Sequence, residues 1–178
     1  MESKSWTYRS KAEWNEGEWT TEPDKVQWLD EKTGYPCLIV RGPVGALCGY
    51  VGVSPGHPLH ETNYNAIEDR ITVHGGLTYS GLCQPDPDDN AHGICHVVEP
   101  GEDDRVWWFG FDCAHYLDLV PGMIHIYSKL KLARDEHSTY RNIEYVKAEV
   151  RDLAAQLHRV ETTTKHEERL PRRTPLHR

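Results

Sequence analysis

The stretch YPCLIVRGPVGALCGYVGV, residues 35–53, contains two short apolar runs of the kind that form strands. Gly42 and Pro43 separate the two runs, and the turn-forming residues 54–56 follow the second one. Two such runs divided by turn residues are typical of a β-hairpin. The glycines inside the second run favour a bulge, or the close approach of another backbone or a ligand.

Beyond this hairpin the sequence predicts further strands and one short helix or turn. Strand-like segments occur at 70–81, where Gly75 and Gly76 interrupt the run, at 94–98 inside a long acidic loop, and at 106–112, VWWFGFD. Within residues 61–69 we expect a short helix or turn with Thr62 as its N-cap, because a threonine hydroxyl accepts an otherwise unpaired backbone N–H.

The segment after the aromatic strand carries the pattern of an amphipathic helix. Apolar side chains recur at three- and four-residue steps from Tyr140 to Leu157, and no Gly or Pro interrupts residues 139–160. Ser138 or Thr139 is the expected N-cap. Because hairpin-length connections dominate, we predict an α+β fold, a mostly antiparallel sheet with a long C-terminal amphipathic helix packed on it.

The length and composition predict a single domain and exclude several classes of function. The 178 residues suggest one α+β domain at 28–160, preceded by a polar, Trp-containing arm at 1–27 and followed by a basic, flexible tail at 161–178. A net charge of -8 argues against a broad nucleic-acid-binding face, although a local basic pocket for a small anion stays open.

The sequence also predicts a soluble, cytoplasmic protein. No apolar run reaches the roughly 20 residues that a membrane span needs, and the first residues lack the apolar core of a signal peptide. The five cysteines are an odd number, so they cannot all pair within the chain, and in a cytosolic setting we expect reduced thiols.

A group of reactive side chains follows the aromatic strand. Asp112, Cys113, His115 and Asp118 lie within seven positions, and His74 precedes the Gly75-Gly76 pair, where a backbone can approach a ligand closely. Imidazoles and carboxylates are ordinary ligands of zinc and other divalent ions, so the predicted metal ligands are His74, Asp112, His115 and Asp118. Without a metal, His74, Asp112 and His115 are the catalytic candidates, with Asp112 orienting His115 as a general base.

Other interpretations of these residues, as well as a metal or catalytic site, stay open. Asp and His at strand ends often only close a turn through hydrogen bonds. A structural zinc site is a weaker alternative because its cysteines lack close-spaced pairs; its members would be Cys83, Cys95, His96, Cys113 and His115. Cys48 or Cys113 could instead act as a nucleophile activated by a nearby histidine.

A ligand pocket is the remaining site hypothesis. His57 and His60 lie in a Gly- and Pro-rich loop, and in a strand Trp107 and Trp108 would point to opposite faces. One tryptophan is then expected in the core, and the other either stacks on a planar base or covers the sheet beneath the helix. The predicted ligand-binding residues are His57, His60, Gly75, Gly76, Trp107 and Trp108.

Four segments together resemble a family of small, uncharacterised accessory proteins of tailed bacteriophages. They are PCLIVRGPVGALCGYVGVSPGHPLH, VHGGLTYSG, WWFGFDCAHYLDLVPG and YRNIEYVKAEVRDLAAQL. The likeness spans about residues 28–158 and carries over no established catalytic residue. It implies a setting, the cytoplasm of an infected bacterium, in which such proteins often counter host defence.

Three functions are consistent with these observations. The first is capture of a small nucleotide-like signalling molecule, since aromatic rings stack on bases and exposed backbone N–H groups meet phosphate. The second is metal-dependent hydrolysis of a phosphoester, with zinc or another divalent ion as cofactor. The third is inhibition of a host protein through the acidic loop at 84–104. Homo-oligomer formation stays open.

Overall fold

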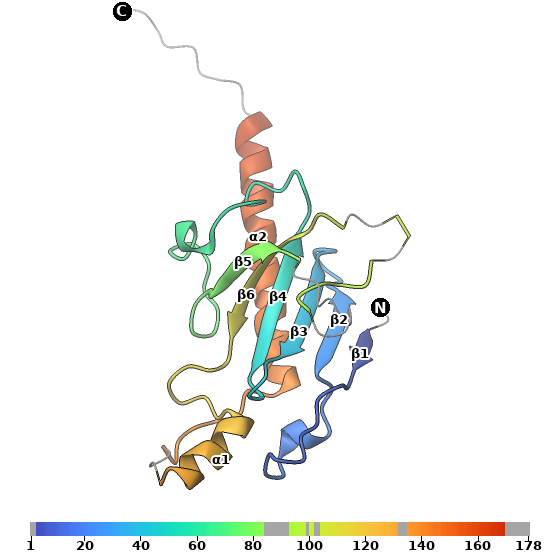
Figure 1. The fold of residues 1–178 in the computed structure, drawn as a ribbon. Helices are drawn as coiled ribbons and strands as arrows, with labels where there is room; N and C mark the ends of the chain where they lie inside the picture. The colour runs from blue at the N-terminus through green and yellow to red at the C-terminus, as the bar shows by residue number, and fades with distance from the viewer. Residues whose placement is uncertain (1–2, 84–92, 99, 102–103, 132–134, 170–178) are drawn as a thin grey trace, which may run out of the picture.

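A computed structural model describes residues 3–83, 93–98, 100–101, 104–131 and 135–169. Within these residues, six strands form one sheet in the order β1-β2-β3-β4-β6-β5, and every neighbouring pair is antiparallel (Figure 1). The strands are β1 (Lys4–Trp6), β2 (Lys25–Leu29), β3 (Pro36–Arg41), β4 (Leu47–Val53), β5 (Tyr79–Leu82) and β6 (Trp107–Asp112). The helices are η1 (Glu18–Thr20), η2 (Tyr64–Ala66), α1 (Pro121–Lys129) and α2 (Ile143–Arg169).

The predicted hairpin is confirmed as the centre of the sheet. Strands β3 and β4 pair with Ile39 opposite Gly49, and β4 pairs on its other side with β6, where Gly49 lies opposite Phe111. Because side chains alternate between the two faces of a strand, each central strand contributes to two apolar clusters. The predicted α+β fold with a mostly antiparallel sheet is therefore correct.

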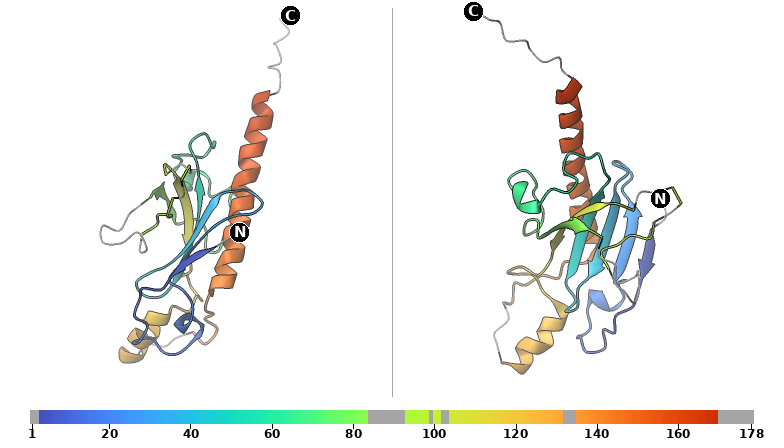
Figure 2. Two further views of the ribbon diagram at one scale, coloured as in Figure 1. Left: turned by 90° about the vertical axis from the view of Figure 1, so that its right-hand side faces the viewer. Right: turned by 45° about the horizontal axis from the view of Figure 1, so that its top comes forward.

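Helix α2 covers one face of this sheet, as Figure 2 shows in the view along the sheet's edge. Its apolar stripe is fully buried against β3, β4 and β6, and includes Val146, Val150 and Leu153. A Cβ atom on Gly49 would lie 2.6 Å from Val150, so the glycine is what lets the helix approach β4 this closely. The close backbone approach that the sequence predicted is provided by a helix and not by a ligand.

The opposite face of the sheet has a smaller apolar cluster. Trp108 is completely buried there and packs with Leu38, Tyr50 and Val106. Residues 93–98 run alongside this face without forming the strand predicted at 94–98. The side-chain amide of Gln27 donates to the carbonyl of Val97 and accepts its backbone N–H. These two hydrogen bonds replace the backbone pairing that a strand at this position would make.

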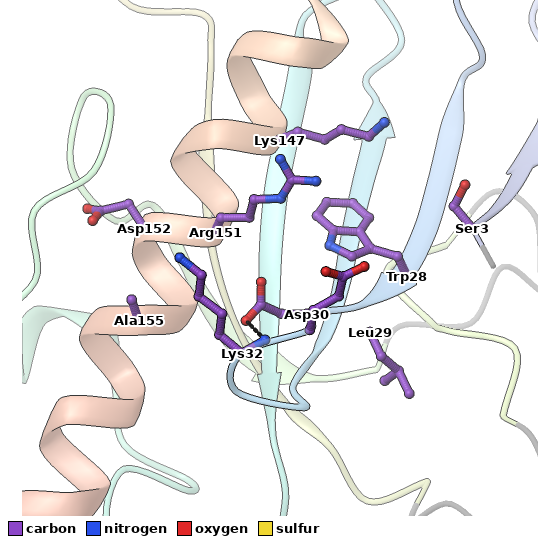
Figure 3. A pocket seen from close by; sticks show the side chains of 10 residues that line it. Ser3, Trp28, Leu29, Asp30, Lys32, Lys147, Arg151, Asp152 and Ala155 are labelled. Atoms are coloured by element: carbon purple, nitrogen blue, oxygen red, sulfur yellow. Dashed lines mark hydrogen bonds between the residues drawn. The ribbon is translucent and has the colours of Figure 1, made fainter. Parts of the chain in front are cut away.

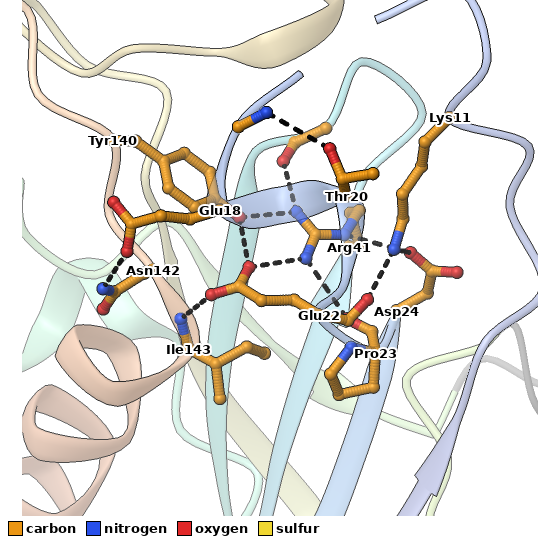
Figure 4. Close-up of polar contacts among 12 residues, drawn as sticks. Lys11, Glu18, Thr20, Glu22, Pro23, Asp24, Arg41, Tyr140, Asn142 and Ile143 are labelled. Atoms are coloured by element: carbon orange, nitrogen blue, oxygen red, sulfur yellow. Dashed lines mark hydrogen bonds and ion pairs between the residues drawn. The ribbon is translucent and has the colours of Figure 1, made fainter. Parts of the chain in front are cut away.

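The residues predicted as an N-terminal arm contribute β1, η1 and the first part of β2, and the predicted boundary at 27/28 falls inside β2. A buried ion network holds this segment against the rest of the sheet (Figure 4). The Arg41 guanidinium is fully buried and makes ion pairs with Asp24 at 3.0 Å and Glu22 at 2.9 Å. Its remaining N–H groups donate to the Tyr140 hydroxyl and to the carbonyl oxygens of Gly45 and Pro23.

Glu22 also fixes the beginning of α2. One carboxylate oxygen accepts the backbone N–H of Ile143 at 2.9 Å, while the Asn142 side chain accepts the N–H of Tyr145 at 3.0 Å. These two acceptors satisfy N–H groups that the first turn of a helix leaves unpaired. The N-cap predicted at Ser138 or Thr139 is wrong, because the helix begins four residues later than expected and continues to Arg169, into the predicted tail.

Two further local predictions need correction. Residues 71–78 form a turn and an extended segment, and only β5 at Tyr79–Leu82 is a strand, because Gly76 N–H bonds the carbonyl of Val73 and closes a turn. Asn63, and not Thr62, caps the short helix η2, with its side chain accepting the N–H of Asn65 at 3.0 Å.

The expectation that all cysteines are reduced is also wrong. Cys83 and Cys95 form a disulfide, with their Cα atoms 4.9 Å apart. The buried Lys25 ammonium donates to the carbonyl oxygens of Gly93 and Cys95, which holds Cys95 against the sheet near the end of β5. In the described part of the chain, none of the helices combines the length and the apolar character needed to cross a membrane.

Candidate functional site

Three segments that are distant in sequence meet beside the end of β6. His74 lies in the turn formed by residues 73–76, whereas His115 and Asp118 lie in the turn that follows β6. The Nε2 atom of His74 is 2.7 Å from Oδ2 of Asp118, and the rings of His74 and His115 are 5.6 Å apart in an edge-to-face arrangement. The predicted convergence of His74 with the residues after the aromatic strand is present in the structure.

Asp118 is the centre of this cluster. Its side chain is fully buried and accepts hydrogen bonds from the His74 ring, from the backbone N–H of His115 at 3.0 Å and from Arg141 Nε at 2.9 Å. Burial by itself raises the pKa of Asp118, but the hydrogen bonds from His74, Arg141 and His115 outweigh it, and the pKa is lowered. The carboxylate is therefore ionised at neutral pH.

His115 has an unused nitrogen that faces this carboxylate. Its Nδ1 atom is buried without a hydrogen-bond partner, and it lies 3.7 Å from Oδ2 of Asp118 and 3.7 Å from Oδ1 of Asp112. A separation of 3.7 Å is too long for a hydrogen bond. A buried, unpaired nitrogen is uncommon in folded proteins and calls for a water, an ion or a ligand to satisfy it.

The His115 ring lies directly on the backbone of Gly75. A Cβ atom at this position would be 2.2 Å from Cε1 of His115 and 2.3 Å from its Nδ1. Gly75 also has a φ of +66°, in the left-handed region that favours glycine. The sequence therefore needs glycine here for two separate reasons, and the predicted importance of Gly75 is one of packing against His115.

Helix α2 supplies the residues that position His74. The Tyr145 hydroxyl is 3.0 Å from His74 Nδ1, and Glu149 accepts the backbone N–H of His74 at 2.8 Å. Arg141, which binds Asp118, also lies over the Tyr145 ring at 4.9 Å. Sequence reasoning missed all three. Tyr145 and Glu149 are four residues apart on α2 and mark a polar stripe beside the apolar one, which was the available signal, whereas Arg141 precedes the helix.

The geometry of the cluster suits a divalent metal ion. One ligand atom each from His74, His115 and Asp118 lies within 4.8 Å of the others. Two ligand atoms on a tetrahedral zinc ion are roughly 3.4 Å apart, given bonds of about 2.0–2.1 Å. The 3.7 Å between His115 Nδ1 and Asp118 Oδ2 is close to this value, whereas the 2.7 Å contact from His74 would have to open slightly. Arg141 binds the other carboxylate oxygen, so Oδ2, which also accepts the backbone N–H of His115, is the oxygen that would bind the ion.

A pocket of about 270 Å³ opens beside this cluster. His115 and Asp118 lie on its wall, and the remaining walls come from the 116–120 turn, α1 and the segment before α2. In the turn, Leu117 has a φ of +71°, a strained conformation for a residue with a side chain. Backbone hydrogen bonds between Thr139 and both Leu117 and Leu119 hold this turn in place.

Asp112 is placed differently from the other predicted ligands. It is close enough to influence His115, but it is outside the set of ligand atoms that converge. Its Oδ1 atom accepts the backbone N–H of Ala114 at 3.0 Å. Asp112 therefore closes a turn, which was the alternative to the hypothesis that it binds a metal.

The cysteines do not provide an activated nucleophile. Cys113 is buried, and burial together with the negative charge of Asp118 raises the pKa of its thiol. Burial likewise raises the pKa of Cys48 to about 11. The alternative structural zinc site is wrong, because Cys83 and Cys95 are consumed in a disulfide and His96 packs on Trp108.

The residues predicted to bind a ligand do not gather around the His74 cluster, apart from the Gly75-Gly76 turn. His57 is buried, its Nδ1 accepts the N–H of Leu59 and its Nε2 lies 3.2 Å from the carbonyl of Leu157. Burial lowers the pKa of His57, so its ring is neutral.

The other predicted ligand residues lie near the start of β6. His60 contacts Trp107 at 6.3 Å between rings and pairs with the Arg105 carbonyl, and Trp107 donates its indole N–H to the Thr62 carbonyl. Trp107 and Trp108 do point to opposite faces, as predicted, but the complete burial of Trp108 leaves no ring face for a base.

The acidic loop predicted as a protein-binding surface lies mostly outside the described residues. No protein-family model, no curated protein and no solved structure matches this chain.

Proposed function

We propose that the protein binds a divalent metal ion through His74, His115 and Asp118 and uses it to hydrolyse a phosphoester in the adjacent pocket. The observation that carries the proposal is the buried, unpaired Nδ1 of His115, which faces an ionised carboxylate oxygen at 3.7 Å. Two imidazoles and one carboxylate are a donor set found in catalytic zinc sites and in non-haem iron sites.

The hydrogen bonds around the cluster are arranged as a metal site needs. For Nε2 of His74 to bind an ion, its Nδ1 must carry the proton, and the Tyr145 hydroxyl at 3.0 Å is placed to accept it. Partners of this kind fix the tautomer and the orientation of a ligating histidine. Arg141 keeps Asp118 ionised without occupying the oxygen that faces His115.

Three protein ligands leave a position open on the ion. A bound metal ion lowers the pKa of a coordinated water to about 7 and supplies hydroxide at neutral pH. The 270 Å³ pocket, whose wall includes His115 and Asp118, lies beside these ligands and would hold the substrate. The likeness to phage accessory proteins points to a phosphorylated signal of a bacterial host as the substrate class.

The first test is metal binding. Titration of the metal-free protein with Zn²⁺ or Co²⁺ should give one equivalent per chain, and the Co²⁺ spectrum reports the coordination geometry. His115→Ala should weaken binding more than about 100-fold, beyond the 10–100-fold typical for loss of a supporting partner. Tyr145→Phe, which removes only such a partner, should weaken it about 10-fold.

His137→Ala is the matched control, because His137 is an exposed histidine whose side chain is 84% accessible. Its metal affinity should equal that of the unmodified protein. Hydrolysis of bis(4-nitrophenyl) phosphate should then require the ion and should be lost in His115→Ala. Metal binding that is equally strong in His115→Ala and His137→Ala would contradict the assigned ligands, and a loaded protein that hydrolyses no phosphoester would contradict the assigned reaction.

A further inference from the structure

A second, larger pocket lies on the other side of the molecule's long helix from the His74 cluster. Its volume is about 660 Å³, within the range of small-molecule sites. It is formed between β2, the turn that joins β2 to β3, and the outer side of α2 (Figure 3). None of the residues of the His74 cluster lines it, so it is independent of the metal site.

Trp28 lines this pocket and has an unused hydrogen-bond donor. The side chain is buried, with 9% of the residue exposed, and its indole N–H has no hydrogen-bond partner. In Figure 3 the indole nitrogen is on the side of the ring that faces α2. An indole nitrogen can only donate, so the partner that is missing must be an acceptor atom.

Three cationic side chains line the same pocket. Lys147 and Arg151 extend from successive turns of α2 toward β2, and Lys32 extends from the β2–β3 turn toward the helix (Figure 3). Among the described residues, no carboxylate lies within ion-pair distance of Lys32 or Arg151, and Lys147 has only a 3.3 Å contact with the exposed Glu144. The pocket therefore offers cationic donors together with a buried neutral one.

Two of the carboxylates in the pocket wall are already engaged. Asp30 accepts the backbone N–H groups of Lys32 and Thr33 and the Thr33 hydroxyl, which closes the β2–β3 turn. Asp152 accepts the side-chain amide of Gln156 at 2.7 Å. Glu31, the third carboxylate that lines the pocket, is exposed and also has an interaction partner. None of these carboxylates accepts the Trp28 N–H, which leaves that donor for an acceptor atom of a ligand.

We propose that this pocket binds a phosphorylated organic molecule of about nucleotide size, with phosphate oxygens accepting from the Trp28 N–H and from Arg151 and Lys32. A phosphate group offers three strong acceptor oxygens, which matches several donors converging from two elements. A volume of 660 Å³ exceeds what a phosphate ion alone would fill and leaves room for an organic part.

The direct test is a titration of the ¹⁵N-labelled protein with AMP, followed at the tryptophan indole resonances. The Trp28 resonance, assigned by its absence in Trp28→Phe, should shift saturably because a free N–H gains an acceptor. Arg151→Gln should weaken AMP binding by about 10-fold or more, the effect of losing one hydrogen bond between charged groups. Trp28→Phe should weaken it similarly.

Two controls make the result specific. Lys129→Gln removes an exposed cation from α1, far from this pocket in the fold, and should leave AMP binding unchanged. His115→Ala should also leave it unchanged, so that failure of the metal site and failure of this pocket are separate results. Arg151 is exposed on α2, so its variant remains folded even if Trp28→Phe perturbs the core.

Three outcomes would overturn the proposal. The first is a Trp28 resonance that stays fixed with AMP and inorganic phosphate at millimolar concentrations, since the N–H would then be satisfied by water. The second is AMP binding with the same affinity in Arg151→Gln as in Lys129→Gln. The third is citrate binding as tightly as AMP with the same dependence on Arg151, which would assign the pocket to carboxylates.

Discussion

The replacement of Gly75 by alanine tests the packing of the candidate metal site, and the chain supplies its own control in Gly76. Both glycines have positive φ angles, +66° and +88°. A Cβ atom on Gly75 would be 2.2 Å from the His115 ring, whereas a Cβ atom on Gly76 has no other atom within 4 Å. Any difference between the two alanine variants therefore reports the contact with His115.

The magnitudes follow from these geometries. Alanine in the left-handed region costs roughly 1–2 kcal/mol, so Gly76→Ala should lower the free energy of unfolding by about that amount. Gly75→Ala has the same backbone cost and an additional overpacking cost of about 1–3 kcal/mol. The ring of His115 must also move by about 1 Å or more to reach an ordinary contact distance. That shift displaces Nδ1 from Asp118, and Zn²⁺ affinity should fall by at least about 10-fold.

Urea unfolding measures the stabilities, and competition with a chromophoric chelator measures the Zn²⁺ affinities. Gly76→Ala should lose stability while keeping the metal affinity of the unmodified protein. Equal stabilities and equal Zn²⁺ affinities for the two alanine variants would show that the His115 ring does not lie on Gly75, and the geometry on which the metal site depends would be wrong.

Three further predictions concern the frame that holds the site. Arg41→Met should destabilise the protein by about 3–5 kcal/mol in urea unfolding, because it removes the buried cation that Asp24 and Glu22 share. A loss of stability below about 1 kcal/mol would contradict this prediction. Burial raises the pKa of Asp24, but hydrogen bonds from Arg9, Tyr8 and Lys11 outweigh it and lower that pKa. The stabilisation is thus complete above the unfolded value of about 3.9 and is lost as the pH falls through the folded pKa. An unfolding free energy that stays constant from pH 5 to pH 2 would refute this predicted contribution of Asp24. Breaking the Cys83–Cys95 disulfide, by serine at both positions, should cost about 3 kcal/mol, the value for closing a loop of this length; mass spectrometry after alkylation of the native protein should find Cys113 unmodified.

The periodic parts of the chain could be predicted from the sequence. The β3–β4 hairpin and the apolar stripe of α2 are visible because their side chains alternate at the period of the element that buries them. The convergence of His74 with His115 and Asp118 was also predictable in outline, because all three follow or interrupt strand-like segments. The end of α2 was not, since a polar helix that extends beyond the sheet has no apolar period.

The parts that were missed depend on charges whose partners are remote in sequence. Lys25 and Arg41 are completely buried, although lysine and arginine usually indicate surface. The acceptors of the Lys25 ammonium are backbone carbonyls about 70 residues away, at Gly93 and Cys95. No local sequence pattern indicates a hydrogen bond between a lysine and backbone carbonyls so distant in the chain. The N-terminal residues were therefore predicted to be an arm and not two strands of the sheet.

The Glu22 carboxylate and the Ile143 N–H that it accepts are 121 residues apart in the chain. During translation the sheet residues up to Asp112 leave the ribosome well before α2 exists to cover them. The apolar face of the nascent sheet therefore stays exposed to water until late in synthesis. The Glu22 carboxylate also stays unpaired until Tyr140 and Ile143 have been made. Such a topology folds slowly and exposes aggregation-prone surface on the way. Newly made chains should consequently depend on chaperones that shield apolar surface, even though the finished domain buries it completely.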